Sequence, residues 1–186
     1  MSGPELSIRT WTADLIELAA HRGRGAEMTA VAAERDIALP SFGHASHAGP
    51  ALALCVRPER WLLLTPAAEP GVAAAGWHSA CAGRGVAIDQ SSGWVALMLS
   101  GPAVCKVLVR SCRLDLSATA FPAGCAAACV IAQVAVTLAA LPQGLLLLTP
   151  ATTARHLREW LAATAQIAGV VAQSGDTVAD WVGGMG

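Results

Sequence analysis

The chain has 186 residues, of which 54% are hydrophobic and 13% are charged, and its formal net charge is −1. This length suffices for one substantial domain or for two small, tightly joined ones. The basic residues form no cluster denser than a pair of arginines. Because nucleic-acid binding needs a concentrated positive footprint, that class of function is excluded.

The high hydropathy raises the question of a membrane span, and the most apolar stretch, residues 126–149, answers it. Gln133 and Pro142 interrupt this stretch, so it does not supply the roughly 20 continuous apolar residues that a spanning helix needs. Residues 1–9 have no basic flank followed by an apolar core, as a signal peptide would. The six cysteines include no CxxC pair, which favours free thiols in a reducing compartment. The sequence therefore predicts a cytoplasmic protein without a membrane anchor.

The first half of the chain alternates strand-like and helix-like segments. Alanines mixed with Glu and Arg give one segment good helix propensity, and the run Arg57-Pro58-Glu59-Arg60 has the proline of a tight turn. Pro, Ser, Gly and His residues predict a loop over residues 39–50. The predicted strands cover residues 14–20, 51–56, 61–65 and 86–89, and the predicted helices cover residues 26–35 and 68–82.

The second half repeats this order of elements. Gly101 and Pro102 place a proline in the first turn of a predicted helix, and Thr152 or Thr153 can cap a second helix. The predicted strands cover residues 94–99, 128–139, 145–149 and 169–172, the helices cover residues 101–112 and 152–166, and residues 114–124 form an irregular connection.

The hexapeptide Leu-Leu-Leu-Thr-Pro-Ala occurs at residues 62–67 and again at residues 146–151, an offset of 84 residues that also relates Pro58 to Pro142. Internal self-similarity of this kind indicates a duplicated unit. Each half has the element order βαββαβ, which is the split βαβ or ferredoxin-like unit. The sequence therefore predicts an α+β fold with two ferredoxin-like halves, at residues 1–91 and 92–173, and a flexible tail at residues 174–186.

The joint between the halves, residues 89–93, contains the polar cluster that could bind a ligand. Asp89 at a strand end, with the hydroxyls of Ser91 and Ser92 beside it, could orient a ligand or meet another chain. The alternative is a simple turn, because Asp and Ser side chains hydrogen-bond their own backbone in turns. The residue types favour the turn and leave the ligand site open.

The other reactive residue types do not form a catalytic pattern. His44 and His47 lack a third metal ligand nearby in the sequence, and Cys125 and Cys129 have no adjacent group that would stabilise a thiolate. No phosphate-binding loop, dinucleotide fingerprint, nucleophile elbow or zinc-protease motif occurs. The sequence predicts no metal site and no self-sufficient catalytic centre.

The chain holds six tryptophans but only two phenylalanines. Trp61, Trp94 and Trp160 fall on predicted regular elements, and we expect them in the core. Trp11 and Trp181 lie near the ends of the chain, where large aromatic residues often anchor contacts with another chain. This distribution is typical of a subunit.

Several segments resemble the gamma subunit of heterotetrameric sarcosine oxidase. They are residues 57–63 (RPERWLL), which fit the xPxxWLL hairpin of that family, residues 87–93 (AIDQSSG), 99–102 (LSGP) and 113–116 (RLDL), which fit its central signature, and residues 121–126 (FPAGCA). The Asp-x-Ser and Ser-Gly-Pro motifs are shared with the folate-binding fold of aminomethyltransferases such as the glycine cleavage T-protein. The resemblance implies structural roles for Pro58, Trp61, Gly101, Pro102 and Asp115, and it supplies no catalytic residue.

The resemblance implies a non-catalytic small subunit that docks on the larger flavoprotein subunits of an enzyme that oxidatively demethylates sarcosine to glycine. It also implies that flavins, a nicotinamide cofactor and zinc are held by the other subunits, and that this chain binds no cofactor. Two alternatives remain at this point. One is a stand-alone folate-binding aminomethyltransferase-like protein that uses Asp89, and the other is a scaffold protein with no enzymatic context.

Overall fold

The structure is a computed structural model, and it describes residues 5–48, 51–67, 69 and 71–177. The chain divides into two compact units. Residues 12–92 are called the first unit, and residues 5–11 together with residues 93–177 are called the second unit. Among the described residues, no helix is long and apolar enough to cross a bilayer.

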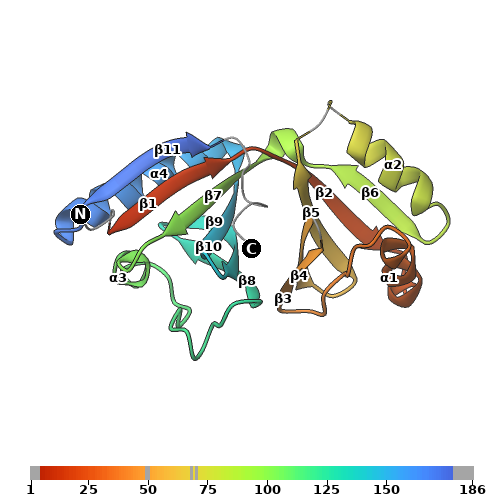
Figure 1. The fold of residues 1–186 in the computed structure, drawn as a ribbon, viewed down its shortest axis with the longest axis horizontal. Helices are drawn as coiled ribbons and strands as arrows, with labels where there is room; N and C mark the ends of the chain where they lie inside the picture. Colours follow the sequence, from red (N-terminus) through yellow and green to blue (C-terminus); the bar gives the residue numbers. More distant parts are fainter. Residues whose placement is uncertain (1–4, 49–50, 68, 70, 178–186) are drawn as a thin grey trace. The chain divides into compact units, whose positions relative to one another are not determined.

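The first unit is a five-stranded antiparallel sheet with two α-helices packed on one face (Figure 1). Its elements are β2 (Ala13–Ala20), α1 (Gly25–Ala33), β3 (His44–Ala48), β4 (Ala51–Arg57), β5 (Arg60–Pro66), α2 (Val72–Ala80), β6 (Gly85–Asp89) and the short 3-10 helix η1 (Ser91–Gly93). The strand order is β3-β4-β5-β2-β6. Met28 of α1 and Trp77 of α2 share a buried cluster with Ile16 and Leu63 of the sheet, so this face forms the core of the unit.

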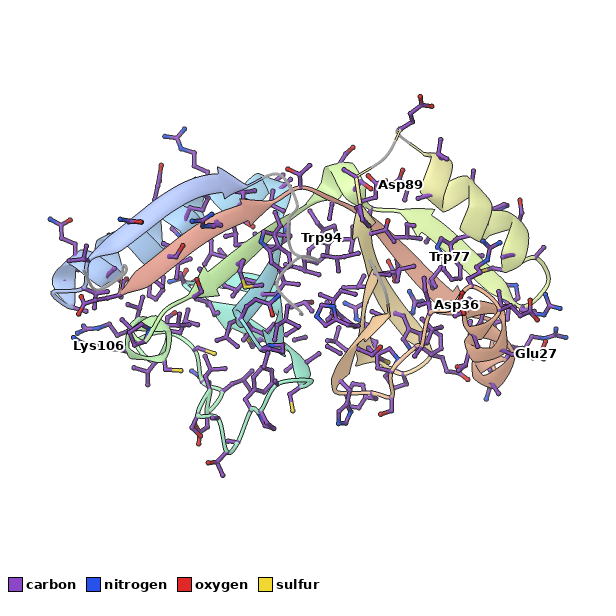
Figure 2. The ribbon with its side chains drawn as sticks, in the orientation of Figure 1. Glu27, Asp36, Trp77, Asp89, Trp94 and Lys106 are labelled. Carbon is purple, nitrogen blue, oxygen red and sulfur yellow. The ribbon has the colours of Figure 1, made fainter. Side chains whose placement is uncertain are left out.

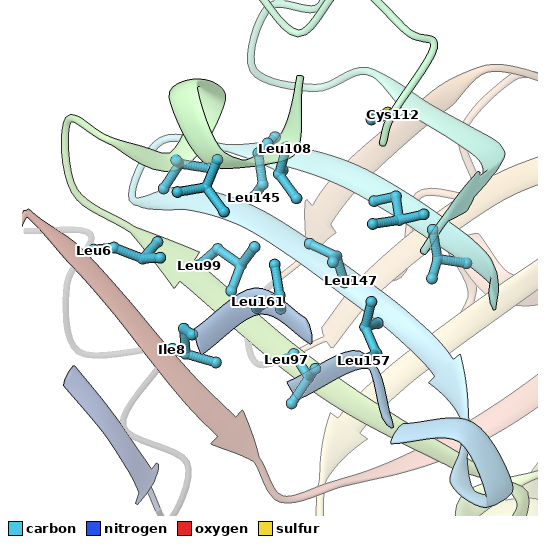
Figure 3. Close-up of a cluster of buried hydrophobic side chains, with 14 of the residues drawn as sticks. Leu6, Ile8, Leu97, Leu99, Leu108, Cys112, Leu145, Leu147, Leu157 and Leu161 are labelled. Carbon is cyan, nitrogen blue, oxygen red and sulfur yellow. The ribbon is translucent and has the colours of Figure 1, made fainter. Parts of the chain in front are cut away.

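The second unit is built on a six-stranded sheet. Its elements are β1 (Leu6–Trp11), β7 (Trp94–Ser100), α3 (Val104–Leu108), β8 (Ala126–Ile131), β9 (Val134–Leu141), β10 (Gly144–Pro150), α4 (Ala151–Ile167) and β11 (Ala172–Thr177). The strand order is β11-β1-β7-β10-β9-β8, and every neighbouring pair is antiparallel except β1 with β11. Figure 3 shows the core, in which Ile8 of β1 and Leu97 of β7 lie near Leu157 and Leu161 of α4.

The prediction of an α+β fold is confirmed, and the two copies of the hexapeptide occupy corresponding strands. The copy in β5 lies between β4 and β2, and the copy in β10 lies between β9 and β7. Each copy is the second strand of a hairpin. Leu63 and Leu147 are completely buried, so the leucine runs are central strands of two sheets.

The N-terminal strand differs from the predicted division into residues 1–91 and 92–173. β1 belongs to the second unit, where it pairs with β7 on one side and β11 on the other. Leu6 and Ile8 alternate with more polar residues and are buried there, a period-two pattern that the sequence reading missed.

The predicted flexible tail at residues 174–186 also needs a correction. Its first residues belong to β11, which pairs with β1 in parallel from Leu6 and Ala172 onward. The closing strand was predicted at residues 169–172. The observed strand β11 begins at Ala172, which is the last residue of that predicted range. Residues 178–186 of the predicted tail lie outside the described residues.

Two predicted segments have a different backbone course. The predicted loop at residues 39–50 contains β3, which pairs with β4. The predicted strand at residues 128–139 is the hairpin of β8 and β9. Ala132 and Gln133 turn it with φ angles of 51° and 65°, and two successive positive φ angles are the geometry of a tight hairpin turn.

The helix boundaries also differ from prediction. The helix expected over residues 101–112 is only α3, since Gly101 has a φ of 107° and stands outside the helix. The helix expected from residue 68 begins at Val72, the first residue of α2. The predicted threonine cap of α4 is wrong, because Pro150 occupies the N-cap and the Thr153 hydroxyl donates to the Pro150 carbonyl at 3.1 Å.

The tryptophans divide as follows. Trp61 is buried in the first unit, and Trp160 packs against the core of the second unit. Trp94 is half-buried. Trp11, which the sequence analysis named as a residue that could anchor a contact with another chain, is only 9% exposed. Trp181 lies outside the described residues.

Candidate functional site

The joint after β6 is a hydrogen-bonded turn that is tied to β2. The Oδ1 atom of Asp89 accepts from the backbone N–H of Ser91 at 2.9 Å and from its hydroxyl at 2.7 Å. The Ser91 hydroxyl in turn accepts from the backbone N–H of Leu15 at 3.0 Å. Gln90 reinforces the tie, because its side-chain amide donates to Glu17 at 3.2 Å. Because Asp89 and Ser91 are two residues apart, the Asp89 carboxylate can reach the backbone N–H of Ser91.

The charge at this joint is exposed to solvent. Asp89 lies at the end of β6, where Figure 2 labels it, and its side chain is exposed. Hydrogen bonds from the Ser91 hydroxyl and backbone N–H lower the pKa of the Asp89 carboxyl below its usual value. The neighbouring Ser92 is also exposed. The arrangement holds an ionised carboxylate at the surface, and its recorded bonds serve the turn itself, so a ligand role for Asp89, Ser91 and Ser92 remains a prediction.

A second Asp-x-Ser turn occurs at Asp115, in the irregular connection of the second unit. Its Oδ1 atom accepts from the backbone N–H of Ser117 at 2.9 Å. This backbone bond, followed by the Ser117 hydroxyl, lowers the pKa of the Asp115 carboxyl. Both aspartates that the family resemblance emphasised therefore stabilise local turns.

Four further motif positions have the following places in the fold. Pro58 lies in the turn between β4 and β5, and the buried Trp61 donates its indole N–H to the Pro40 carbonyl at 2.9 Å. This bond ties β5 to the segment that precedes β3. Pro102 lies beside Gly101 between β7 and α3 and is exposed.

Three of the motif segments meet at one hollow in the second unit. The hollow has a volume of about 450 Å³ and lies among α3, the irregular connection and the turn between β9 and β10. The residues that line it are Gly101, Val104, Cys105, Leu116, Ala118, Phe121, Pro122, Ala123, Ala140, Leu141, Pro142, Gln143, Gly144 and Leu145. Its walls are mostly apolar, as in many small-molecule and peptide-binding pockets.

The sequence reading missed this hollow, although its parts were visible. Gly101, Leu116 and Phe121 each belong to a segment that resembles the family motifs, and the fold brings them together. The Cys105 thiol closes part of the wall by donating to the Leu116 carbonyl at 3.4 Å. The convergence could have been suspected from the motifs alone, since unconnected signature segments often meet at one place in a fold.

The two histidines for which the sequence predicted no metal site lie on opposite faces of β3. His44 and His47 lie three residues apart in this strand, and alternate residues of a strand point to opposite faces. Burial lowers the pKa of His47. Among the residues that the structure describes, no group of three or more His, Cys, Asp or Glu side chains could hold a metal ion.

The cysteines form a pair that spacing along the sequence did not indicate. Cys129 lies near Cys112 rather than Cys125, with 4.0 Å between the two sulfur atoms. Burial, with Cys112 as a neighbour, raises the pKa of the Cys129 thiol to about 12. A thiol of this kind stays protonated at neutral pH and is a poor nucleophile.

The fold thus defines a class, the α+β proteins that are built on two sheets. No protein-family model matches the chain, and no curated protein matches it. Among solved structures, the heterotetrameric sarcosine oxidase from Corynebacterium sp. U-96, in complex with pyrrole 2-carboxylate, has a chain that matches with a TM-score of 0.78 and 23% identity. The match covers 92% of this chain and 89% of that chain.

A second solved structure is similar over part of its length. The glycine cleavage system aminomethyltransferase T from Bartonella henselae matches with a TM-score of 0.67 and 14% identity, over 92% of this chain and 48% of that chain. The present chain thus spans about half of the aminomethyltransferase. Together the two likenesses confirm, at the level of the fold, the resemblance seen in the sequence.

Proposed function

We propose that this chain is a gamma-type, non-catalytic subunit of a heterotetrameric sarcosine oxidase, and that it acts in assembly and stability of the complex. The observation that carries the proposal is the extent of the structural likeness, which covers 92% of this chain and 89% of a chain of the Corynebacterium enzyme. The motif segments at the hollow and at the Asp89 turn support the same assignment.

The chemistry of the described residues supports a role without catalysis. Oδ1 of Asp89 is held by Ser91, and the hollow in the second unit has mostly apolar walls. Neither arrangement pairs a nucleophile with a base or aims donors at a reacting atom. In this proposal the larger subunits carry the flavins, the nicotinamide cofactor and the zinc, and they oxidise sarcosine to glycine in the cytoplasm.

Purification from the host cell tests the proposal. A chain tagged at its own chromosomal locus should elute with larger flavoprotein subunits, visible by flavin absorbance, and the eluate should oxidise sarcosine. An 18.9 kDa chain that elutes alone, with no flavoprotein, would contradict the proposal.

The non-catalytic part of the proposal has a separate test in the same complex. Asp89→Asn keeps a side-chain oxygen for the Ser91 bonds, so the turnover number of the assembled enzyme should stay within about twofold of the wild type. Asp115→Asn is the matched control, since its turn has the same form. A loss of turnover in Asp89→Asn alone, with assembly intact, would show that Asp89 takes part in the chemistry.

The alternative is a folate-binding aminomethyltransferase-like protein, which the likeness to aminomethyltransferase T favours. The chain spans 48% of the length of that protein. Titration calorimetry of the purified chain with tetrahydrofolate separates the two functions. The subunit proposal predicts no heat of binding to the isolated chain, and saturable binding that Asp89→Asn abolishes would support the alternative.

A further inference from the structure

The sheet of the first unit ends at β6, whereas the sheet of the second unit continues past the corresponding strand. β6 pairs with β2 beyond β5, and β1 pairs with β7 beyond β10. β1 has a further strand, β11, on its other side, and the Leu6 N–H donates to the Val171 carbonyl at 3.2 Å where this pairing begins. In the described part of the chain, β6 has no strand on its other side (Figure 1). The first sheet therefore lacks a sixth strand that the second sheet has.

The two strands also correspond residue by residue. At the same position of each hexapeptide copy, the opposing residue is Glu17 in β2 and Met98 in β7. Glu17 also pairs with Ile88 of β6, and Met98 also pairs with Arg9 of β1. Ile88 therefore has the place of Arg9, and β11 shows how a sixth strand lies beside a strand in this position.

The backbone of β6 directs hydrogen-bonding groups outward at this edge. In an antiparallel pair, residues that bond to the neighbouring strand alternate with residues that face away from it. The Gln90 N–H donates to the Leu15 carbonyl at 2.8 Å, so Gln90 and every second residue before it face β2. Ala87 and Asp89 face outward, and within the described residues their backbone N–H groups have no hydrogen-bond partner. These groups are placed to pair with another strand.

The side chains at this edge do not oppose such pairing. Val86 is 38% exposed and Ile88 is 44% exposed, and they share one face of the sheet because alternate residues of a strand point the same way. Exposed edge strands usually carry a lysine, a proline or a bulge that prevents pairing. β6 has the sequence GVAID and pairs with β2 without a bulge, so it has none of these protections.

The charge at the end of β6 indicates which kind of strand fits this edge. Asp89 is exposed and is the last residue of β6. Opposite charges across neighbouring strands are stabilising and like charges are destabilising, so the carboxylate favours a strand with a Lys or Arg beside it. Residues 178–186, which follow β11, contain Asp180 and no Lys or Arg. The C-terminal end of this chain therefore does not have the composition that the edge favours.

A second copy of the chain does not supply the cation either. Two copies of β6 that pair about a two-fold axis run antiparallel, and the outward-facing residues of one copy oppose those of the other. Asp89 would then oppose Gly85, Ala87 or Asp89 of the other copy. It would not oppose Arg84, whose guanidinium lies 3.8 Å from Glu27. The charge thus favours a strand from a different polypeptide.

We propose that the outer edge of β6 binds an extended segment of one of the larger subunits, which joins the first sheet as its sixth strand. This inference rests on the function proposed above and names the surface that meets the partner. The segment runs parallel to β6, as β11 runs along β1, and its backbone bonds to Ala87 and Asp89. It carries β-branched residues beside Val86 and Ile88 and a Lys or Arg beside Asp89. Because an exposed ion pair contributes little, Asp89→Asn should leave the complex assembled.

A proline at Ala87 tests the edge while it keeps the sheet. Since the Ala87 N–H faces outward, Ala87→Pro preserves the bonds between β6 and β2, and its ring blocks the incoming strand. Ala128→Pro is the matched control, because Ala128 faces outward in β8, the edge strand of the second unit. In chains tagged at the chromosomal locus, Ala87→Pro should reduce the co-purified flavoprotein at least about tenfold, and Ala128→Pro should leave it within about twofold. Flavoprotein retained at the wild-type level by Ala87→Pro would overturn the proposal.

Hydrogen exchange of the wild-type protein supplies a test that needs no variant to fold. In the purified complex, the amides of Ala87 and Asp89 should exchange at least about tenfold more slowly than in the isolated full-length chain, because they gain hydrogen bonds. The Ala128 amide should change little. Equal exchange of Ala87 and Asp89 in an intact complex would overturn the edge inference and leave the subunit proposal standing, whereas a chain that binds no flavoprotein would overturn both.

The isolated chain distinguishes the other strands that could cover the edge. Slow exchange of Ala87 and Asp89 without any partner subunit would overturn the proposal. If that protection disappears on dilution, a second copy covers β6. If it disappears on deletion of residues 178–186, the C-terminal end of the same chain covers it.

Discussion

The two copies of Leu-Leu-Leu-Thr-Pro-Ala have the same sequence and corresponding places in their sheets, yet they lead into different helices. After the copy in β10, α4 begins at Ala151 and continues to Ile167, whereas after the copy in β5 the helix α2 begins only at Val72 and ends at Ala80. The Thr149 hydroxyl lies 3.3 Å from the Thr153 hydroxyl. By contrast, the Thr65 hydroxyl is buried with no hydrogen-bond partner in the described part of the chain.

The residues that follow each copy explain the difference. After the first copy come Pro70 and Gly71. Proline disfavours the helical region for the residue before it, and Gly71 has a φ of 80° at the N-cap of α2. After the second copy no such residue interrupts the chain until Gly169. The comparison shows that a repeated strand does not guarantee a repeated helix.

The fifth strand of each sheet, counted from β3 in the first unit and from β8 in the second, differs as well. In the first unit β6, which follows α2, pairs beside β2, whereas in the second unit β1 from the N-terminus occupies the corresponding place beside β7. The strand that follows α4 is displaced outward and pairs with β1. Duplication of the local sequence thus leaves open which segment completes each sheet.

Among the expected effects, removal of β1 should produce the largest difference in stability between the two sheets. Deletion of residues 1–11 removes the buried side chains of Leu6 and Ile8 and leaves β7 and β11 without their shared neighbour. We expect hydrogen-exchange protection to be lost across β7 and β11, at least about 100-fold, because the core of the second unit loses a central strand. Protection of β2 and β5 should persist.

Deletion of residues 1–4 alone is the control for this experiment, since it leaves β1 in place. It should change protection little. Loss of protection in β2 and β5 rather than in β7 would mean that the N-terminal strand completes the first sheet.

Gly144 and Arg60 occupy the same position of the repeat. Substitution by alanine should lower the free energy of unfolding much more at Gly144 than at Arg60. Gly144 has a φ of 149°, and a Cβ atom there would collide with the backbone oxygen of Leu99. Gly144→Ala should therefore lower the free energy of unfolding by about 3 kcal/mol. Arg60 is about half exposed and pairs with Glu17 at 3.0 Å, so Arg60→Ala should cost no more than about 1 kcal/mol.

Urea unfolding of both variants measures the difference. A Gly144→Ala variant as stable as the wild type would show that β10 does not approach β7 as closely as described.

Substitution by valine should change the free energy of unfolding differently at the two threonines of the hexapeptide copies, Thr65 and Thr149. Thr149→Val removes the hydroxyl bond to Thr153 and should cost about 1 kcal/mol. Thr65→Val removes a buried hydroxyl that has no partner within the described residues, and it should leave stability unchanged or raise it by up to about 1 kcal/mol. Thermal unfolding of the two variants side by side decides the point, and an equal loss in both would refute the distinction.

The two Asp-x-Ser turns should differ in how strongly the serine hydroxyl lowers the pKa of the aspartate, which is the smallest effect expected. The Ser91 hydroxyl is the largest cause of the lowered pKa of Asp89, whereas the backbone N–H of Ser117 is the largest cause for Asp115. Ser91→Ala should therefore raise the pKa of Asp89 more than Ser117→Ala raises that of Asp115, because alanine keeps the backbone N–H. Carboxyl-carbon NMR titration measures both shifts.

The sign of the pH effect follows from the lowered pKa values. An aspartate with a lowered pKa stabilises the folded state above its unfolded pKa, and this contribution is lost as the pH falls through the folded pKa. For Asp89 and Asp115 the loss should occur below the ordinary value of 3.8. Equal shifts in the two serine variants would contradict the assigned causes.

The sequence predicted the repeat, the α+β class and most strands, because leucine runs and turn prolines are local signals. It missed the hairpin at Ala132 and Gln133, because neither residue type favours the positive φ angles that this turn needs. It also missed the place of β1, since partner strands far apart in the chain leave no local pattern. The hollow and the pairing of Cys112 with Cys129 depend on that long-range arrangement, so spacing along the sequence could not reveal them.

Native mass spectrometry of the chain purified from its host tests the central claim most directly. If the chain is a gamma-type subunit, it should be found in a larger assembly that binds flavin and oxidises sarcosine, and gentle dissociation should release it as an intact 18.9 kDa subunit. Detection of only the free chain or its homodimer, in cells where sarcosine oxidation is active, would contradict the proposed function.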